Sequence, residues 1–124
     1  MKILLICLAT LSAVLAKEHE VITGGPSHFA FIPQNLTIRA GDTVKWVWQD
    51  PIPHSVVESA GGSPDQICVA KQGGFNSQKI TGSGKSYSQT FNNVGVVYYN
   101  CDVPGHCELG MWGKISVVCA QCPI

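Results

Sequence analysis

The stretch from Tyr98 to Met111, Tyr-Tyr-Asn-Cys-Asp-Val-Pro-Gly-His-Cys-Glu-Leu-Gly-Met, decides how the rest of the chain is interpreted. A short β-rich run ends at Cys101, and the Pro104-Gly105 pair that follows predicts a turn. His106 lies five residues after Cys101, and Met111 lies five residues after His106. A single loop with a turn inside it therefore presents a thiol, an imidazole and a thioether.

This set of donors is typical of one kind of metal site. Two imidazoles and one thiolate in a plane, with a weak thioether on the axis, are the ligands of a blue copper electron-transfer site. The loop lacks one imidazole, which the upstream run Pro51-Ile52-Pro53-His54 offers. The residues therefore predict one type 1 copper ion held by His54, Cys101, His106 and Met111. The alternatives are a disulfide cysteine at Cys101 and a core methionine at Met111.

Composition excludes several other classes of protein. The 124 residues include 8 basic and 8 acidic side chains, so the basic excess of a nucleic-acid-binding protein is missing. A hydrophobic content of 45% excludes a disordered chain. No segment approaches the roughly 18 apolar residues that a membrane span needs.

Short runs separated by glycine and proline turns predict an all-β fold. Apolar residues alternate clearly at Val44, Trp46 and Trp48, whereas no window of 11 residues shows a helical stripe. Residues 61–74 form the longest irregular piece, with one helical turn expected near 64–68. The spacing is typical of a Greek-key β-sandwich or barrel of about seven or eight strands. We expect strands at residues 20–22, 28–32, 35–39, 42–48, 55–58, 86–91, 95–100 and 114–118.

The N-terminus has the pattern of a secretory signal peptide. One lysine precedes an apolar run from Ile3 to Ala16, which ends in a small residue. We expect residues 1–16 to be removed and residues 17–124 to form a single secreted domain. In a secreted chain, Asn35-Leu36-Thr37 is a glycosylation sequon, so Asn35 is a candidate glycan site.

The cysteines support a metal-bound thiol. Cys7 would leave with the signal peptide, and the odd number that remains leaves one thiol outside any intramolecular disulfide. Cys101 is the candidate for that thiol. Cys119 and Cys122 are predicted to form a small local disulfide. A bridge from one of them to Cys68, or to another subunit, is the alternative.

These residues resemble the cupredoxins, the type 1 blue copper proteins. The run from Phe31 to Val56 is similar to the cupredoxin G-D-x-V-x-W strand followed by a P-H-x-V ligand motif. The run from Ser86 to Met111 is similar to the later one, which ends in Y-x-C, then His, then Met. The ligand loop resembles that of the phytocyanins, and the N-terminal half resembles plastocyanin. The phytocyanin resemblance implies a disulfide between Cys68 and Cys107.

The resemblance also implies a function. It implies a cupredoxin-like fold and a carrier that passes single electrons to an unidentified redox protein by cycling copper between Cu(II) and Cu(I). We expect a monomer. We do not expect an enzyme, because the H-x-H motifs of multicopper oxidases are missing. His106 would lie at an apolar edge where the partner docks. The alternative function is an extracellular copper-binding protein for copper uptake, storage or delivery.

Four further residues have weaker expectations. Ser55 and Asp102 adjoin ligands and are expected to form hydrogen bonds that orient the ligand loops. His19 would be the third residue after cleavage, where an amine, amides and an imidazole can bind Cu(II) in a plane. The simpler interpretation, which we favour, is an exposed histidine. His28 is predicted to be a surface or strand histidine, and no spacing in the sequence indicates a partner for it.

Overall fold

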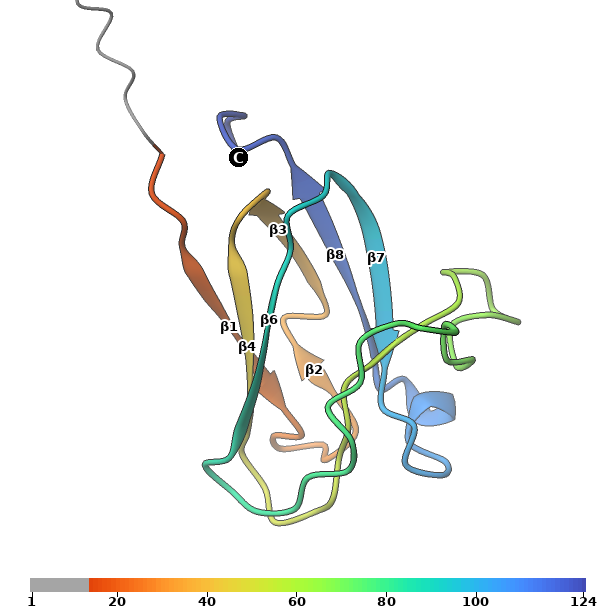
Figure 1. The fold of residues 1–124 in the computed structure, drawn as a ribbon. Helices are drawn as coiled ribbons and strands as arrows, with labels where there is room; N and C mark the ends of the chain where they lie inside the picture. Colours follow the sequence, from red (N-terminus) through yellow and green to blue (C-terminus); the bar gives the residue numbers. More distant parts are fainter. Residues whose placement is uncertain (1–13) are drawn as a thin grey trace, which may run out of the picture.

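The computed structural model describes residues 14–124, so Cys7 and most of the expected signal peptide lie outside the described residues. Within that range the chain forms eight strands and one short 3-10 turn (Figure 1). None of the described residues belongs to a helix long and apolar enough to cross a membrane. In chain order the elements are β1 Glu18–Thr23, β2 Phe31–Ile32, β3 Asn35–Arg39, β4 Thr43–Trp48, β5 Val57–Glu58, β6 Ser86–Thr90, β7 Gly95–Asn100, η1 Cys107–Leu109 and β8 Trp112–Val118.

The strands form two four-stranded sheets, in the orders β2-β1-β4-β6 and β3-β8-β7-β5. Two of the pairings, β1 with β4 and β3 with β8, are parallel, and the others are antiparallel. The sheets face each other across a shared hydrophobic core, so the architecture is a two-layer sandwich. The prediction of an all-β sandwich is confirmed.

The core forms because alternate residues of the strands point inward. Along β4, Val44, Trp46 and Trp48 are buried, and the residues between them are only partly covered. The ring of Trp46 lies against Tyr99 of the opposite sheet, with ring centroids 5.1 Å apart and an edge-on geometry. Edge-on aromatic pairs of this kind add to the stability gained from burial. The two sheets are therefore joined at their centre by large aromatic side chains.

Two of the eight expected strands are much shorter than predicted, and two others, at 42–48 and 86–91, are each shorter by one residue. The expected strand at residues 28–32 is reduced to β2, because Gly24, Gly25 and His28 have positive φ angles and turn the chain sharply. The expected strand at 55–58 begins only at Val57, because the backbone N–H of Ser55 faces the sulfur of Cys101 instead of a neighbouring strand. Residues 64–68 form a turn, as expected.

Two loops at one end of the sandwich bear the predicted ligands. One connects β4 to β5 and contains His54, and the other connects β7 to β8 and contains Cys101, His106 and η1. Figure 1 shows both loops at the lower end of the sandwich. β5 pairs with the end of β7, with Val57 opposite Asn100, so the end of the first ligand loop lies beside the start of the second.

Candidate metal centre

His54 is held rigidly by its backbone. Its N–H donates to the carbonyl of Ile80 at 3.0 Å, and the N–H of Ile80 donates back to the carbonyl of His54 at 2.8 Å. This isolated bridge lies outside the named strands. The His54 side chain has 0% of its surface exposed, so its position is set by packing as well as by the backbone.

The second ligand loop is closed by its own backbone hydrogen bonds. The N–H of Cys101 donates to the carbonyl of Met111 at 3.0 Å, so the loop returns to its starting point. The N–H groups of His106 and Met111 donate to the carbonyls of Val103 and His106, at 3.0 and 3.2 Å. Gly105 lies between these bonds with a φ of 85°, a conformation that favours glycine. The loop is therefore tight enough to present its side chains in one arrangement.

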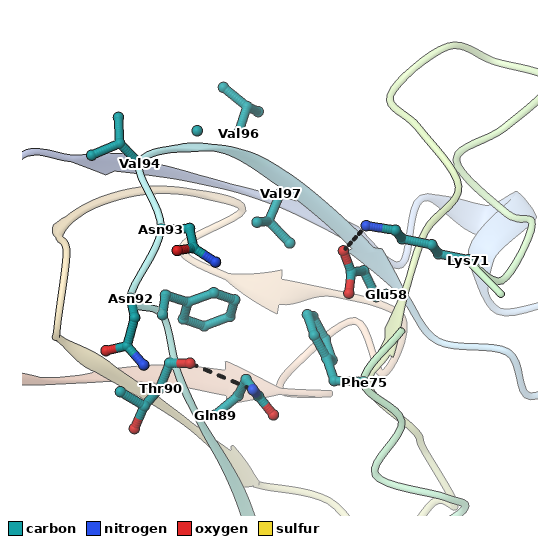
Figure 2. Close-up of a pocket in the computed structure, with 12 residues that line it drawn as sticks. Glu58, Lys71, Phe75, Gln89, Thr90, Asn92, Asn93, Val94, Val96 and Val97 are labelled. Carbon is teal, nitrogen blue, oxygen red and sulfur yellow. Dashed lines mark hydrogen bonds and ion pairs between the residues drawn. The ribbon is translucent and has the colours of Figure 1, made fainter. Parts of the chain in front are cut away.

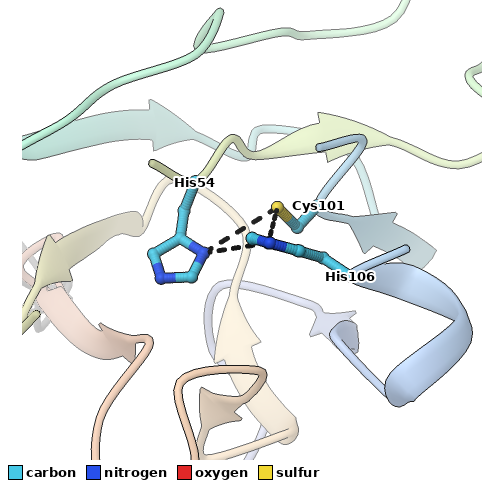
Figure 3. A group of neighbouring side chains, drawn as sticks. All are labelled: His54, Cys101 and His106. Carbon is cyan, nitrogen blue, oxygen red and sulfur yellow. Dashed lines mark hydrogen bonds between the residues drawn. The ribbon is translucent and has the colours of Figure 1, made fainter. Parts of the chain in front are cut away.

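The three strongest candidate ligands meet in one buried cluster (Figure 3). The Sγ atom of Cys101 lies 3.4 Å from Nδ1 of His106 and 4.0 Å from Nδ1 of His54. The two Nδ1 atoms are 3.3 Å apart. All three ligand atoms lie within 4.8 Å of one another, which is close enough for one metal ion to contact all of them. Two imidazoles with one thiol is a donor set suited to copper.

Burial sets the protonation of these groups before any metal binds. It lowers the pKa of His54, although the neighbouring Asp50 carboxylate opposes this effect, and it lowers the pKa of His106. Burial raises the pKa of the Cys101 thiol. The two imidazoles are therefore kept in the neutral form that binds metals. The thiol must give up its proton when a metal binds, so metal binding is coupled to proton release.

Met111 ends the same loop and is completely buried. It belongs to the main hydrophobic cluster together with Cys101, and its carbonyl accepts the hydrogen bond from the Cys101 backbone. Its role as an axial ligand stays a prediction.

Ser55 and Asp102 join the two ligand loops. The backbone N–H of Ser55 points at Sγ of Cys101 at 3.4 Å. The Ser55 hydroxyl accepts a bond from the N–H of Asp102 at 2.9 Å and donates to the Asp102 carboxylate. The loop that contains His54 and the loop that contains Cys101 are therefore tied together at the residues next to the ligands.

Four of the cysteines lie in pairs in the structure. Cys68 and Cys107 form a disulfide with an S–S distance of 2.01 Å, and Cys119 and Cys122 form another at 1.95 Å. Among the described residues Cys101 is the free cysteine, and it is buried. The first disulfide attaches the ligand loop, at the residue after His106, to the turn at residues 64–68.

Sequence reasoning missed two neighbours of the ligands. Nε2 of His54 lies 3.0 Å from Oδ1 of Asp50, and Nδ1 of His28 lies 3.1 Å from Oδ2 of the same carboxylate. His28 is half exposed, in keeping with the expected surface histidine, but it has a partner in Asp50 that no spacing in the sequence indicated. The ring of Phe29 meets that of His106 edge-on, with centroids 4.9 Å apart. The only feature of the sequence that could have indicated the Asp50–His54 contact is the position of Asp50 four residues before His54.

His19 differs from the favoured expectation of an exposed histidine. Its Nε2 atom lies 2.8 Å from Oδ2 of Asp42, and its side chain is only 16% exposed. The backbone N–H of Lys17 donates to the other oxygen of Asp42 at 2.9 Å. Two of the groups that a planar Cu(II) site would need, the Lys17 nitrogen and the His19 imidazole, are thus engaged by one carboxylate, which argues against that alternative.

A separate hollow lies beside β6 and β7, away from the histidines (Figure 2). Its charged groups, Glu58 and Lys71, already pair with each other at 3.3 Å. The rest of its lining consists of amide, hydroxyl, aromatic and valine side chains, without a thiol or imidazole. This hollow therefore lacks the thiol and imidazole donors that the cluster at the sandwich end provides.

A two-sheet sandwich with His54, Cys101 and His106 clustered at one end defines a cupredoxin, with a site consistent with one type 1 copper ion. The model of the copper-binding proteins of the plastocyanin/azurin family matches residues 18–118, and the chain belongs to that family.

The relatives agree with this assignment. Plastocyanin A'/A'' of Nicotiana tabacum is 29% identical over 99 residues, which are 79% of this chain and 98% of the relative. The halocyanin of Natronomonas pharaonis is 32% identical over 102 residues, 81% of this chain and 56% of the relative. The fold is similar to that of a purple cupredoxin from Nitrosopumilus maritimus, with a TM-score of 0.62 and 24% identity, covering 80% of this chain and 98% of that one.

Proposed function

We propose that this protein is a secreted carrier of single electrons that cycles one copper ion between Cu(II) and Cu(I). The observation that supports this function best is the buried cluster of His54, Cys101 and His106, whose ligand atoms face one another within 4.8 Å. When bound, copper supplies the one-electron chemistry. Met111 is the proposed axial ligand, because a long thioether contact completes the donor set of a blue copper site.

The protein's own contribution is to hold the ligands still. His54 is anchored by two backbone bonds to Ile80, and Cys101 is anchored by its bond to Met111. The Ser55–Asp102 bonds join the two loops. Because Cu(II) and Cu(I) prefer different geometries, a rigid set of ligands reduces the rearrangement that each electron transfer requires.

His106 is the proposed exit for the electron. It retains 8% of its surface exposed, whereas His54 retains none. Pro104 and Gly105, directly before it, are exposed, and so is Pro51 on the other ligand loop. These neighbours of His106 are small and apolar, whereas the exposed carboxylate of Glu108, two residues further on, adds one negative charge to the edge. Together with the zero net charge of the chain, this supports a partner that docks without strong dependence on salt.

The alternative function is copper uptake, storage or delivery. A delivery protein must release its ion to an acceptor, which requires ligands that the acceptor can reach. Here all three ligands of the cluster are buried, and the Cys101 side chain has no exposed surface. Burial therefore favours a carrier that retains its copper.

The decisive experiment combines a copper titration with repeated redox cycles. The purified protein should bind one tight copper ion and develop an intense absorption in the red part of the visible spectrum. Ascorbate should bleach this band, and ferricyanide should restore it in full through many cycles in the presence of a Cu(I) chelator. Loss of copper to the chelator at each reduction would favour delivery, and the absence of the band would contradict the proposed site.

Secretion is supported by the two disulfides, since disulfides persist in oxidising compartments. Signal cleavage near Ala16, a monomeric state and a glycan at Asn35 stay predictions. Asn35 is exposed at the start of β3, so a glycan there would point away from the core. Intact-mass measurement of the secreted protein, before and after removal of N-glycans, tests both the cleavage and the glycan.

A further inference from the structure

A buried carboxylate lies directly behind one of the copper ligands. Asp50 is 5% exposed, and its Oδ1 atom lies 3.0 Å from Nε2 of His54. Since Nδ1 of His54 faces Cys101 and His106, Nε2 is the nitrogen that points away from the metal. An imidazole that binds a metal through Nδ1 carries its proton on Nε2, so His54 donates this bond to Asp50.

Asp50 is surrounded by donors. Besides His54, its Oδ1 atom accepts the backbone N–H of Ile52 at 3.0 Å. Its Oδ2 atom lies 3.1 Å from Nδ1 of His28, whose side chain is 49% exposed. A carboxylate that receives three donors and sits next to a metal ligand places a fixed negative charge behind the copper. His28 continues this chain of contacts to the surface.

The surrounding backbone is shaped to fit this arrangement. A Cβ atom on Gly24 would lie 2.2 Å from Oδ2 of Asp50 and 3.0 Å from Nε2 of His54, so only glycine leaves room for the pair. His28 adopts a φ of 66°, which is unfavourable for a residue with a side chain. The fold therefore maintains a strained residue at the position from which its ring reaches Asp50.

The ligand on the other loop lacks such support. Among residues 14–124, His106 has no protein hydrogen-bond partner at Nε2, and its ring meets Phe29 instead. Of the two candidate imidazole ligands, the Asp50 carboxylate therefore hydrogen-bonds only His54.

We propose that Asp50 is a positioning residue that orients His54 toward the copper and lowers the reduction potential of the site, and that His28 moderates this effect by donating to the same carboxylate. This inference rests on the proposed copper function. A negative charge behind a ligand stabilises Cu(II) more than Cu(I), because Cu(II) has the larger positive charge. A donor on the carboxylate withdraws part of that negative charge.

Two substitutions should shift the potential in opposite directions. Asp50→Asn removes the charge and should raise the potential, with a loss of Cu(II) affinity of about 10- to 100-fold, as is usual for such partners of metal ligands. If Cu(I) affinity is unchanged, each tenfold loss raises the potential by about 59 mV. His28→Gly removes the donor, suits the positive φ and should lower the potential by a smaller amount, because the ring is half exposed.

The double variant shows whether His28 acts through Asp50. In the Asp50→Asn background, His28→Gly should cause no further shift, because the carboxylate that it moderates is gone. An equal shift in both backgrounds would overturn the role of His28.

The chain offers a matched control in Asp42, which is also buried and bonded to a histidine, but at the opposite end of β4. Asp42→Asn should reduce stability and leave the potential unchanged.

A copper-free measurement separates this inference from the proposed function. In the apo-protein, two-dimensional ¹H–¹⁵N spectra of the imidazole rings should show His54 with its proton on Nε2. Asp50→Asn should shift it toward a mixture of the two tautomers. The inference is overturned if His54 carries its proton on Nδ1, or if Asp50→Asn changes neither the tautomer nor the potential. A wild-type protein that shows the expected tautomer but no blue band would contradict only the proposed function.

Discussion

The backbone N–H of Ser55 points at the sulfur of Cys101 across 3.4 Å, although 46 residues separate the two in the sequence. The contact joins the residue after one ligand to the thiol of another. It places a hydrogen-bond donor on the sulfur that copper is expected to bind, and such donors tune the potential of a blue copper site. The identity and geometry of this sulfur are the basis of the first prediction.

Replacing Cys101 by serine should abolish the blue colour. A hydroxyl is a poor substitute for a soft thiolate, so the intense visible band should disappear and the affinity for copper should fall. The serine is close in size to cysteine, so the fold should survive. Visible absorption of the copper-titrated variant, with circular dichroism as the folding control, checks this prediction. A folded variant that stays blue would show that another thiol binds the metal.

Met111→Gln should lower the reduction potential without removing the colour. An amide oxygen favours Cu(II) relative to a thioether, and the three ligands in the plane are unchanged. Cyclic voltammetry of the wild-type and variant proteins at one pH gives the shift. An unchanged potential would mean that Met111 is only a core methionine, which its complete burial also permits.

Ser55→Ala should loosen the connection between the ligand loops. It removes two hydrogen bonds with Asp102 but keeps the backbone N–H that faces Cys101. At about 1 kcal/mol per bond, the free energy of unfolding should fall by about 1–3 kcal/mol, and the blue band should remain. Urea unfolding measures the change. Ser88→Ala, on an exposed position of β6, is the control and should have little effect.

Removing the disulfide between Cys68 and Cys107 should destabilise the protein by about 3–4 kcal/mol, because the disulfide closes a long loop of the unfolded chain. The double variant Cys68→Ala, Cys107→Ala should also bind copper less tightly, because Cys107 adjoins His106. The variant without the Cys119–Cys122 disulfide is the matched control. It should lose less, about 2 kcal/mol, since its loop is short. Equal losses in the two variants would contradict this explanation.

The apo-protein should be most stable between about pH 6.5 and pH 9. Burial lowers the pKa of His54 and of His106 from 6.5, so below that pH the unfolded chain takes up protons first and stability falls. Burial raises the pKa of Cys101 from 9.0, so above that pH the unfolded chain loses its proton first and stability falls again.

Thermal unfolding as a function of pH measures this window. In the Cys101→Ser variant the alkaline decline should weaken, whereas the acidic decline should stay. An alkaline decline of the same size in the variant would show that another group causes it.

The sequence predicted the His54, Cys101 and His106 cluster because these residues lie in short motifs, and Met111 stays a predicted axial ligand. The spacing of Cys101, His106 and Met111 within one loop, and the prolines beside His54, are local features with a direct chemical meaning. The eight strands were also recognisable, since alternating burial leaves an alternating sequence, as in β4. The largest errors in strand length lay at residues 28–32 and 55–58. Positive φ angles shorten the first strand, and the contact of Ser55 with the sulfur of Cys101 delays the start of the second.

The contacts behind the ligands could not be found in the same way. Asp50, His28 and Gly24 come from two loops that meet only because β1 pairs in parallel with β4, which brings Thr23 opposite Trp48. Likewise His19 reaches Asp42 because the same pairing aligns the other ends of these strands. The pattern of apolar residues along the sequence does not indicate which loop residues will come into contact at the ends of two paired strands.

The amino-acid sequence by itself thus determined the fold class and three donors of the metal site, His54, Cys101 and His106, because residue type and spacing dictate burial and ligand chemistry. Only the tertiary structure decided that a buried carboxylate supports His54 but that no protein group hydrogen-bonds Nε2 of His106 among the described residues. The physical reason is that hydrogen bonds between distant loops depend on strand pairing and close packing, which join residues that the chain keeps apart.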